Sequence, residues 1–373
     1  MNRLQKFVSW KSLACLLLPG VAAAQTPTLS GYMEVHLNKQ ENLPTEADLH
    51  RFVLMVGHRF SDRLKFWSEV EVEHAFVEVE GGEETGEVAI EQAYIDLMVH
   101  RRFNLRAGMV LMPVGIVNER HEPPTFNGVE RTMVDTVIVP TTWRDTGIGA
   151  FGDLGRGFSY RAYAVPGLDA AGFSADEGIA GGRQQGGRAD VSDPAFTGRL
   201  EFRQAGFTAG ASLWRGGAGF GLIRLDIDTP AVTVSSLDAR YRRGRHELRG
   251  QWSMVNISGA ADLNRALQIH TGLSPNIASR LLGAYAEAAT RVSPDAWSHE
   301  VVAFGRYEKY DTQNEMPDGF LPLEEFRRSA WVGGATYYPD PDVAFKFDVV
   351  RERNKSSVVN APWKLNFGVG WWF

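Results

Sequence analysis

The sequence has a single cysteine, Cys15, and none after the first 24 residues. If those 24 residues are removed, the remaining chain has no internal disulfide, no thiol nucleophile and no thiolate metal ligand. The rest of the sequence also lacks an apolar run of about 20 residues, the length that a transmembrane helix needs. These absences exclude a disulfide-stapled scaffold, a cysteine-dependent enzyme and a helical membrane protein.

The first 24 residues are typical of an export signal, which has a basic start, a short apolar run and a cleavage site of small residues. The three parts follow in that order: Arg3, Lys6 and Lys11, then residues 13–21, then Ala22, Ala23 and Ala24. We expect residues 1–24 to be removed before Gln25, leaving one domain over residues 25–373. A lipoprotein signal ending at Cys15 is the alternative, but the preceding "SWKSLA" is too polar for an apolar region.

Charge and composition narrow the class further. Three of the 39 basic residues lie in the signal, which leaves 36 against 45 acidic residues, a net charge of −9. An acidic chain is a poor partner for nucleic acid. The sequence also contains 39 Gly, 10 Trp, 10 Tyr and 21 Phe. An exported chain that is rich in glycine and aromatic residues and lacks helical spans is typical of an outer-membrane β-barrel.

The last residues alternate to the end of the chain. Trp363, Leu365, Phe367, Val369, Trp371 and Phe373 share one face, and Lys364, Asn366, Gly368, Gly370 and Trp372 share the other. A strand of about eleven residues is long enough to cross a bilayer at a tilt. The alternative is an edge strand of a soluble sandwich.

Similar segments recur along the chain and predict the fold. We predict an all-β protein, a closed antiparallel transmembrane β-barrel of about 16 strands, with short periplasmic turns alternating with long extracellular loops, the first of them near 39–48. Two segments are ambiguous: 219–228 is interpreted as a hairpin inside a loop, and 274–291 has features of a helix start at Ser274 and Pro275. The predicted strands are 29–38, 49–60, 63–76, 88–99, 103–112, 146–153, 158–166, 195–203, 207–215, 231–241, 245–255, 280–291, 298–309, 328–339, 342–353 and 363–373.

The alternation also assigns a face to each residue. In 342–353, Phe345 and Phe347 point outward while Ala344 and Asp348 point inward. An interior with many charges must be wet, because an unpaired charge in a dry core costs several kcal/mol. Sixteen strands leave room for an aqueous channel; the alternative is a plugged lumen in which the charges pair with one another. The basic residues expected on the inner wall are Arg106, Arg161, Arg199, Arg249, Arg306 and Lys346.

Four segments carry a resemblance to a known family: "NERHEPPTFNGVER", "VPTTWRDTGIGAFG", "FGRYEKYDTQ" and "FGVGWWF". Together they resemble outer-membrane porins related to the phosphate-selective porin O and P family. The resemblance implies a barrel that is often trimeric and has a loop-narrowed channel. It also implies a last strand that the barrel-assembly machinery reads, through Phe367, Val369, Trp371 and Phe373. The inward arginines are interleaved with Glu and Asp, so phosphate selectivity is not carried over.

The third long loop, 113–145, is expected to fold into the lumen. The apolar side chains of Val134, Val137, Ile138 and Val139 are suited to packing on the inner wall. His121 is expected to make an ordinary contact within the loop, since no second His lies at metal-ligand spacing. We expect an acidic face at Glu119, Glu122 and Glu130 opposite the basic wall, which creates a transverse field. The residues predicted to form the pore constriction are Glu119, Arg120, Glu122, Glu130, Arg131 and Asp135.

The function predicted from these features is a weakly selective outer-membrane porin of a Gram-negative bacterium, passing small hydrophilic solutes and ions. The alternatives are a substrate-specific, phosphate-like anion channel and a structural or adhesive barrel. An enzyme is not predicted, because the sequence shows no Ser–His pairing or carboxylate dyad. No cofactor and no metal site are expected. The expected partners are outer-membrane lipid, the assembly machinery and two further copies of the chain.

Overall fold

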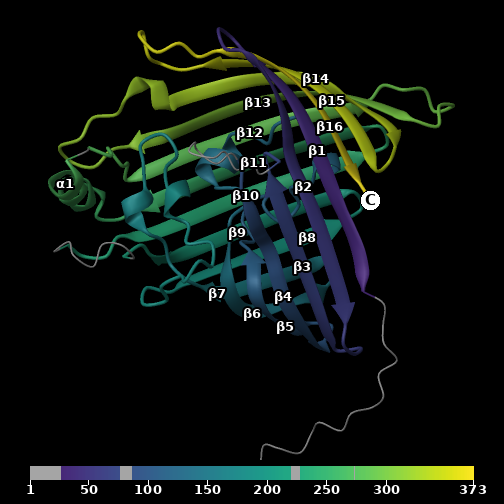
Figure 1. The fold of residues 1–373 in the computed structure, drawn as a ribbon, viewed down its shortest axis with the longest axis horizontal. Coiled ribbons are helices and arrows are strands. Elements are labelled where there is room, and N and C mark those ends of the chain that lie inside the picture. Colours follow the sequence, from purple (N-terminus) through teal and green to yellow (C-terminus); the bar gives the residue numbers. More distant parts are fainter. Residues whose placement is uncertain (1–26, 76–85, 220–226, 273) are drawn as a thin grey trace, which may run out of the picture.

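The computed structural model describes residues 27–75, 86–219, 227–272 and 274–373. In these residues sixteen antiparallel strands pair with their neighbours in chain order, and β1 pairs with β16, so the sheet closes into a barrel (Figure 1). The strands are β1 Thr28–Gln40, β2 Thr45–Arg59, β3 Leu64–Glu73, β4 Val88–His100, β5 Phe103–Leu111, β6 Arg144–Gly155, β7 Phe158–Val165, β8 Ala195–Gln204, β9 Phe207–Gly217, β10 Ala231–Arg243, β11 His246–Ile257, β12 Arg280–Arg291, β13 Glu300–Glu315, β14 Arg327–Asp340, β15 Val343–Arg353 and β16 Trp363–Trp372.

The predicted fold class is confirmed, and each predicted strand has its counterpart. The largest difference in bounds is at β13, which ends at Glu315 rather than 309. Short helical segments interrupt the connections: the 3-10 helices η1 Pro123–Thr125, η3 Ala170–Gly172, η4 Ala180–Gly182 and η5 Glu324–Phe326, the π-helix η2 Val134–Ile138, and the α-helix α1 Ala260–Thr271. Among the described residues, none of the helices is both long and apolar enough to cross a membrane.

The connections lie at two ends of the barrel. We call the end that holds Thr28 and Phe373 the turn end, and the opposite end the loop end. The first loop-end connection, predicted as a long loop near 39–48, is only the four residues 41–44, so that prediction is wrong. The reason is that β1 and β2 remain paired as far as Lys39 and Thr45.

The helix start considered as an alternative at Ser274 is not found, and the predicted strand 280–291 is confirmed. The helix of this loop is α1, which lies upstream and ends where Gly272 adopts a φ of 74°. The following strand, β12, begins at Arg280 because its residues pair with both β11 and β13. The other ambiguous segment, 219–228, falls largely outside the described residues.

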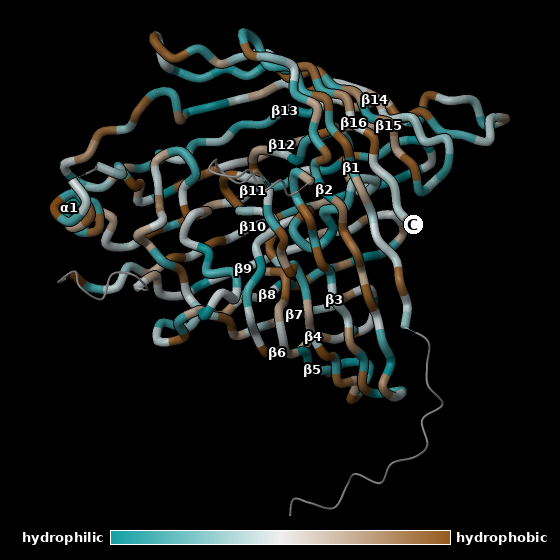
Figure 2. Tube along the Cα trace, in the orientation of Figure 1, coloured by the Kyte–Doolittle hydropathy of each residue, from teal (hydrophilic) through white to brown (hydrophobic). Residues whose placement is uncertain are grey.

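The predicted alternation of faces is confirmed. Phe345 and Phe367 on the outer face are 50% and 45% exposed, whereas the inward Ala344 and Asp348 are buried. Figure 2 shows the resulting change of hydropathy along successive residues of the strands. The outer face is therefore apolar, and the polar chemistry of the protein lies inside the barrel.

An apolar core fills part of the interior near the loop end. The predicted packing of Val134 and Ile138 is confirmed, since both are buried in one cluster with Val255 and Leu281 of the barrel wall. The α1 residues Leu263 and Leu267 and residues of the 166–194 loop belong to the same cluster. This core joins the loops to the wall at β5 and along β7–β13.

The barrel closes at the last residue of the chain. Gly31 and Phe373 exchange two backbone hydrogen bonds, of 3.0 and 2.9 Å, and the Phe373 ring stacks on Phe52 at a centroid distance of 6.0 Å. A Cβ atom at Gly31 would lie 2.3 Å from the Val53 carbonyl oxygen and 2.6 Å from the Phe373 ring. The seam therefore requires glycine at this position.

We expect Phe367→Arg to destabilise the folded barrel by about 2–4 kcal/mol, because it places a charge on the apolar outer face near the middle of a strand. The measurement is urea unfolding in lipid vesicles. Thr208→Arg is the matched control, since Thr208 lines a cavity inside the barrel, and it should change stability by less than about 1 kcal/mol. Equal losses for the two variants would contradict the assigned faces.

Candidate channel interior

Residues 112–143, which we call the interior loop, cross the inside of the barrel. Inward side chains from strands around most of the circumference hold the loop. Most of them form hydrogen bonds with its backbone. The bonds are Gly115 O with Arg199 at 3.2 Å, Ile116 N with Gln251 at 2.8 Å, Asn127 with Glu287 at 2.7 Å, Val129 N with Asp348 at 2.6 Å and Met133 N with Glu308 at 2.6 Å.

A buried histidine adds a further anchor on the opposite wall. His121 Nε2 lies 3.0 Å from Glu91 of β4 and 3.8 Å from Glu69 of β3, and Nδ1 lies 3.1 Å from the carbonyl oxygen of Asn118. Burial alone would lower the pKa of His121, but the Glu91 carboxylate outweighs it and raises the pKa above its ordinary value. The charged pair fixes the start of the interior loop against β3 and β4.

The predicted constriction residues lie at different levels of the barrel. Glu119 pairs with Arg161 of β7 at 3.1 Å, and Arg120 with Glu201 of β8 at 3.3 Å. Glu130 lies at the other side of the lumen. There it pairs with His36 at 3.1 Å and accepts a hydrogen bond from Asn38 at 2.9 Å.

The environment of Glu130 keeps it ionised. Its burial favours the protonated form, but the hydrogen bond and charge of His36 outweigh that effect and lower the pKa of Glu130 to about 2. A carboxylate at this position therefore remains negative at every pH at which the barrel would normally function.

The other three predicted constriction residues take different roles. Asp135 is fully buried and accepts hydrogen bonds from Thr132 and from Gln251 at 2.7 Å, and burial raises its pKa to about 6. Arg131 is half-buried and donates to Thr142 at 3.5 Å. Glu122 is half-buried and directly precedes η1.

The arrangement of two opposed charged walls, expected from the sequence, is not what the structure shows. Arg161 pairs with Glu119 of the loop, whereas Arg106, Arg249 and Arg306 pair with acidic residues directly opposite them on neighbouring strands. Arg199 pairs with Asp238 two strands away, and Lys346 packs on an aromatic ring. Arg106 forms two bonds to Asp96 (2.8 and 2.9 Å), Arg199 binds Asp238, Arg249 and Arg306 both bind Glu287 (2.7 and 3.1 Å), and the Lys346 ammonium lies 3.8 Å from the centre of the Phe126 ring.

Cavities lie on both sides of the interior loop. A loop-end cavity of about 550 Å³ lies between the loop, β1, β2 and β16. Two adjoining turn-end cavities, of about 500 and 800 Å³, share Arg120, Arg240, Arg242 and Arg249 in their walls. Phe126 borders all three cavities, so it marks the place where the interior loop separates the loop-end space from the turn-end space.

The turn-end cavities carry an excess of arginine. Glu201 is shared by Arg199, Arg120 and Arg203, and Glu247 is shared by Arg240 and Arg242. One carboxylate neutralises one guanidinium at most, so these groups leave net positive charge facing the cavities. The loop-end cavity is lined by five acidic residues and four lysines or arginines: Glu34, Glu46, Asp48, Glu73 and Glu130, with Lys39, Arg51, Arg131 and Lys364.

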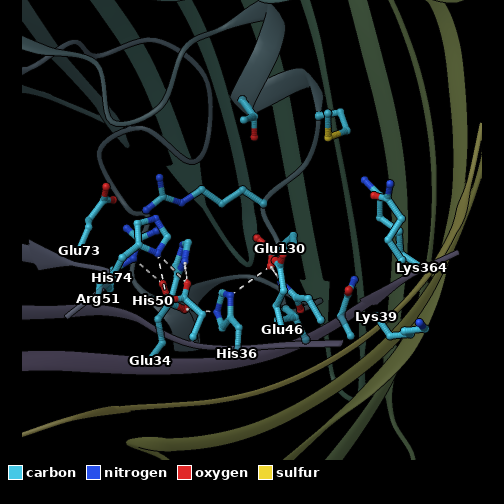
Figure 3. Close-up of a pocket in the computed structure, with 18 of the residues that line it drawn as sticks. Glu34, His36, Lys39, Glu46, His50, Arg51, Glu73, His74, Glu130 and Lys364 are labelled. Carbon is cyan, nitrogen blue, oxygen red and sulfur yellow. Dashed lines mark hydrogen bonds and ion pairs between the residues drawn. The ribbon is translucent and has the colours of Figure 1, made fainter. Parts of the chain in front are cut away.

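The sequence prediction missed a group of histidines in the wall of the loop-end cavity. Figure 3 shows His36, His50 and His74 gathered there beside Glu130 and Arg51. A signal was present in the sequence, because Asp48 and His50 are separated by one residue and therefore share a strand face. His74 comes from the end of β3, which the sequence alone did not bring to the same point.

Comparison with known proteins gives one relative in sequence. The sequence matches no protein-family model. A protein of Aquifex aeolicus (strain VF5), described as an uncharacterized protein, is 36% identical over 359 residues. The aligned region covers 93% of this chain and 80% of that protein.

Solved structures establish the type of barrel. OmpF of Salmonella typhi in complex with daunomycin superposes with a TM-score of 0.61, the anion-selective porin from Comamonas acidovorans with 0.60, and OmpT of Vibrio cholerae in its trimer form with 0.58. The matches cover 93%, 93% and 94% of this chain and 97%, 99% and 100% of those chains, at identities of 12%, 12% and 9%. At this identity the likeness shows the fold, which is that of outer-membrane porins.

We expect Glu287→Gln to destabilise the barrel by about 3 kcal/mol, because Arg249 and Arg306 would lose the carboxylate that both share inside the protein. The measurement is the free energy of unfolding in detergent. Glu300→Gln removes an exposed partner of Arg291 and should change stability by less than about 1 kcal/mol. If the two variants lost equal stability, the buried ion pairs of the wall would not stabilise the barrel more than exposed ones do.

Proposed function

This chain belongs to one family with the Aquifex aeolicus protein and has the fold of outer-membrane porins, and on that basis we propose that it forms a channel for passive diffusion of small hydrophilic solutes and ions. The observation that carries the proposal is the presence of polar cavities on both sides of a loop inside a closed barrel. Charged residues line these cavities, so they are suited to water rather than to apolar ligands.

The interior loop is the proposed constriction. Its residues Glu119 and Arg120 line a turn-end cavity, and Glu130 and Arg131 line the loop-end cavity. Asp135 lies in the packed part of the loop, so its proposed role is to hold the loop in place rather than to meet solutes. Arg199 and Arg306 of the wall serve the same purpose through their bonds to the carbonyl oxygens of Gly115 and Asn127.

Weak selectivity is the primary proposal, because most charges in the interior have a partner of opposite sign. A preference for anions is the second candidate. It is favoured by the shared carboxylates Glu201 and Glu247, which leave several turn-end arginines incompletely neutralised. A specific phosphate site is not part of this proposal.

Location and assembly belong to the same proposal. The apolar outer face and the porin fold support residence in an outer membrane, with the loop end outside the cell. Removal of residues 1–24, which precede the described part of the chain, fits export to that membrane. We also propose a homotrimer, in line with the trimer form described for OmpT, and recognition of the last strand by the assembly machinery.

Single-channel recordings in planar bilayers test the channel. We expect an open current from the wild type and, for the double variant Arg240→Gln/Arg242→Gln, a reversal potential shifted toward cations. The shift should shrink between about 0.1 M and 1 M salt, where the Debye length falls to about 3 Å. Arg265→Gln on α1 is the control and should leave the reversal potential unchanged. A wild-type barrel that is folded but carries no current would contradict the proposal.

Deleting Phe373 should lower the amount of folded protein in the outer membrane several-fold. The deletion removes both backbone bonds to Gly31 and the ring that stacks on Phe52, and it removes the proposed recognition residue. The measurement is the fraction of heat-modifiable protein in isolated outer membranes. Phe60→Ser, which removes an exposed aromatic ring at the turn end away from the seam, should leave that fraction close to normal.

A further inference from the structure

Asp48, His50 and His74 form a compact group at the wall of the loop-end cavity (Figure 3). Asp48 Oδ2 lies 3.1 Å from His50 Nδ1 and 2.9 Å from His74 Nδ1. One ligand atom of each residue lies within 4.8 Å of the other two. All three side chains are partly exposed, at 27%, 22% and 46%, so ions in the cavity can reach them.

The local backbone directs these side chains to one point. The pairing of β1 with β2 shifts between Glu34–Arg51 and His36–Asp48, so β2 carries one extra residue there, a β-bulge. The bulge lets both His50 and Arg51 face the interior, which regular alternation forbids, and β-bulges commonly re-aim side chains in this way.

His74 is brought to the same place by the end of β3. Its φ is 49° and that of Ala75 is 57°, a left-handed conformation that is uncommon for residues other than glycine. Its backbone N–H donates to the carbonyl oxygen of His50 at 3.3 Å. The ring of His74 meets the ring of His50 edge-on, at a centroid distance of 5.5 Å.

We propose that Asp48, His50 and His74 bind one divalent transition-metal ion of the zinc class at the mouth of the lumen. Zinc takes imidazole nitrogens and carboxylate oxygens at about 2.0–2.2 Å in a tetrahedral arrangement, in which neighbouring ligand atoms lie about 3.3 Å apart. The observed separations from Asp48 are close to that value. With three protein ligands, the fourth position falls to water from the cavity.

The residues around Asp48, His50 and His74 favour a bound cation. His36 stacks on His50 at a centroid distance of 4.3 Å and an angle of 16°, which fixes the orientation of the His50 ring. The cavity wall carries five carboxylates against four lysines and arginines, an excess of one negative charge. The neighbouring cation Arg51 is buried and paired with Glu34 and Glu71, so its charge is largely compensated.

Two other groups are poorer candidates. His36 has both ring nitrogens next to carboxylates, Nε2 at 3.2 Å from Glu34 and Nδ1 at 3.1 Å from Glu130, so both already take part in ion pairs. His121 with Glu69 and Glu91 is buried, with no side chain above 2% exposure, and it anchors the interior loop. The three side chains of the Asp48 group are instead partly exposed.

Zinc binding to the purified, folded full-length barrel tests the proposal by equilibrium dialysis at neutral pH. We expect one Zn²⁺ per chain, and at least a tenfold weaker binding in Asp48→Asn and in His74→Gln. His74 lies outside the strands, so its variant does not threaten the closure of the barrel. His58→Gln is the matched control. His58 lies on β2, the strand of Asp48 and His50, but its ring contacts Phe60, so this variant should bind zinc as the wild type does.

Unchanged binding in His74→Gln would overturn the proposal, and loss of binding in Glu130→Gln would then assign the ion to His36, His50 and Glu130. In bilayers, Zn²⁺ should shift the reversal potential of the wild type toward anions but not that of His74→Gln, because a bound ion adds positive charge to the cavity. Dialysis needs no open channel, so failure of the metal site and failure of the proposed channel are distinguishable.

Discussion

A sheet surrounded by lipid must pair its own backbone groups, because lipid provides no hydrogen-bonding partner. In this protein the last pair to form in chain order is between β1 and β16, where Gly31 and Phe373 exchange two hydrogen bonds. Closure with both chain ends at the turn end requires an even number of strands. It also forces each strand to present one face to the surroundings and one to the interior, so side chains of opposite character alternate along it. The polar interior is thus a direct consequence of the closed sheet.

The closed sheet also explains how the interior charges are satisfied. Residues directly opposite each other on neighbouring strands lie close enough to pair, and Arg249, Glu287 and Arg306 occupy such positions on three successive strands. Carboxylates of the same wall also hold the interior loop. Glu308 accepts from Arg306 with one oxygen and from the Met133 N–H with the other, and Asp348 accepts from the Val129 N–H. The loop is therefore held mainly through its backbone, and its own charged side chains are left to line the cavities.

The fold was predictable because the signals for a barrel are local. Alternation over about ten residues gives each strand, its bounds and its faces, as Phe345 and Asp348 illustrate. The helix α1 was not predicted. Ser274 and Pro275 resemble a helix start, but pairing of the residues from Arg280 onward with β11 and β13 outweighs that preference. The partners of the wall arginines were not predictable, because they depend on the register between strands, and register is not encoded in any one strand.

The Asp48 group lies where the regular pattern fails, and the two facts have one cause. Strict alternation assigns His50 and Arg51 to opposite faces of the sheet, so the sequence pattern alone predicts that only one of them faces the lumen. The bulge in β2 places both inside and lets Arg51 hold Glu34 while His50 meets Asp48 and His74. A regular barrel wall offers each strand only every second residue to the lumen. A bulge adds a further inward side chain to that set, so irregularities in the pairing are places where binding groups of a barrel wall are to be sought.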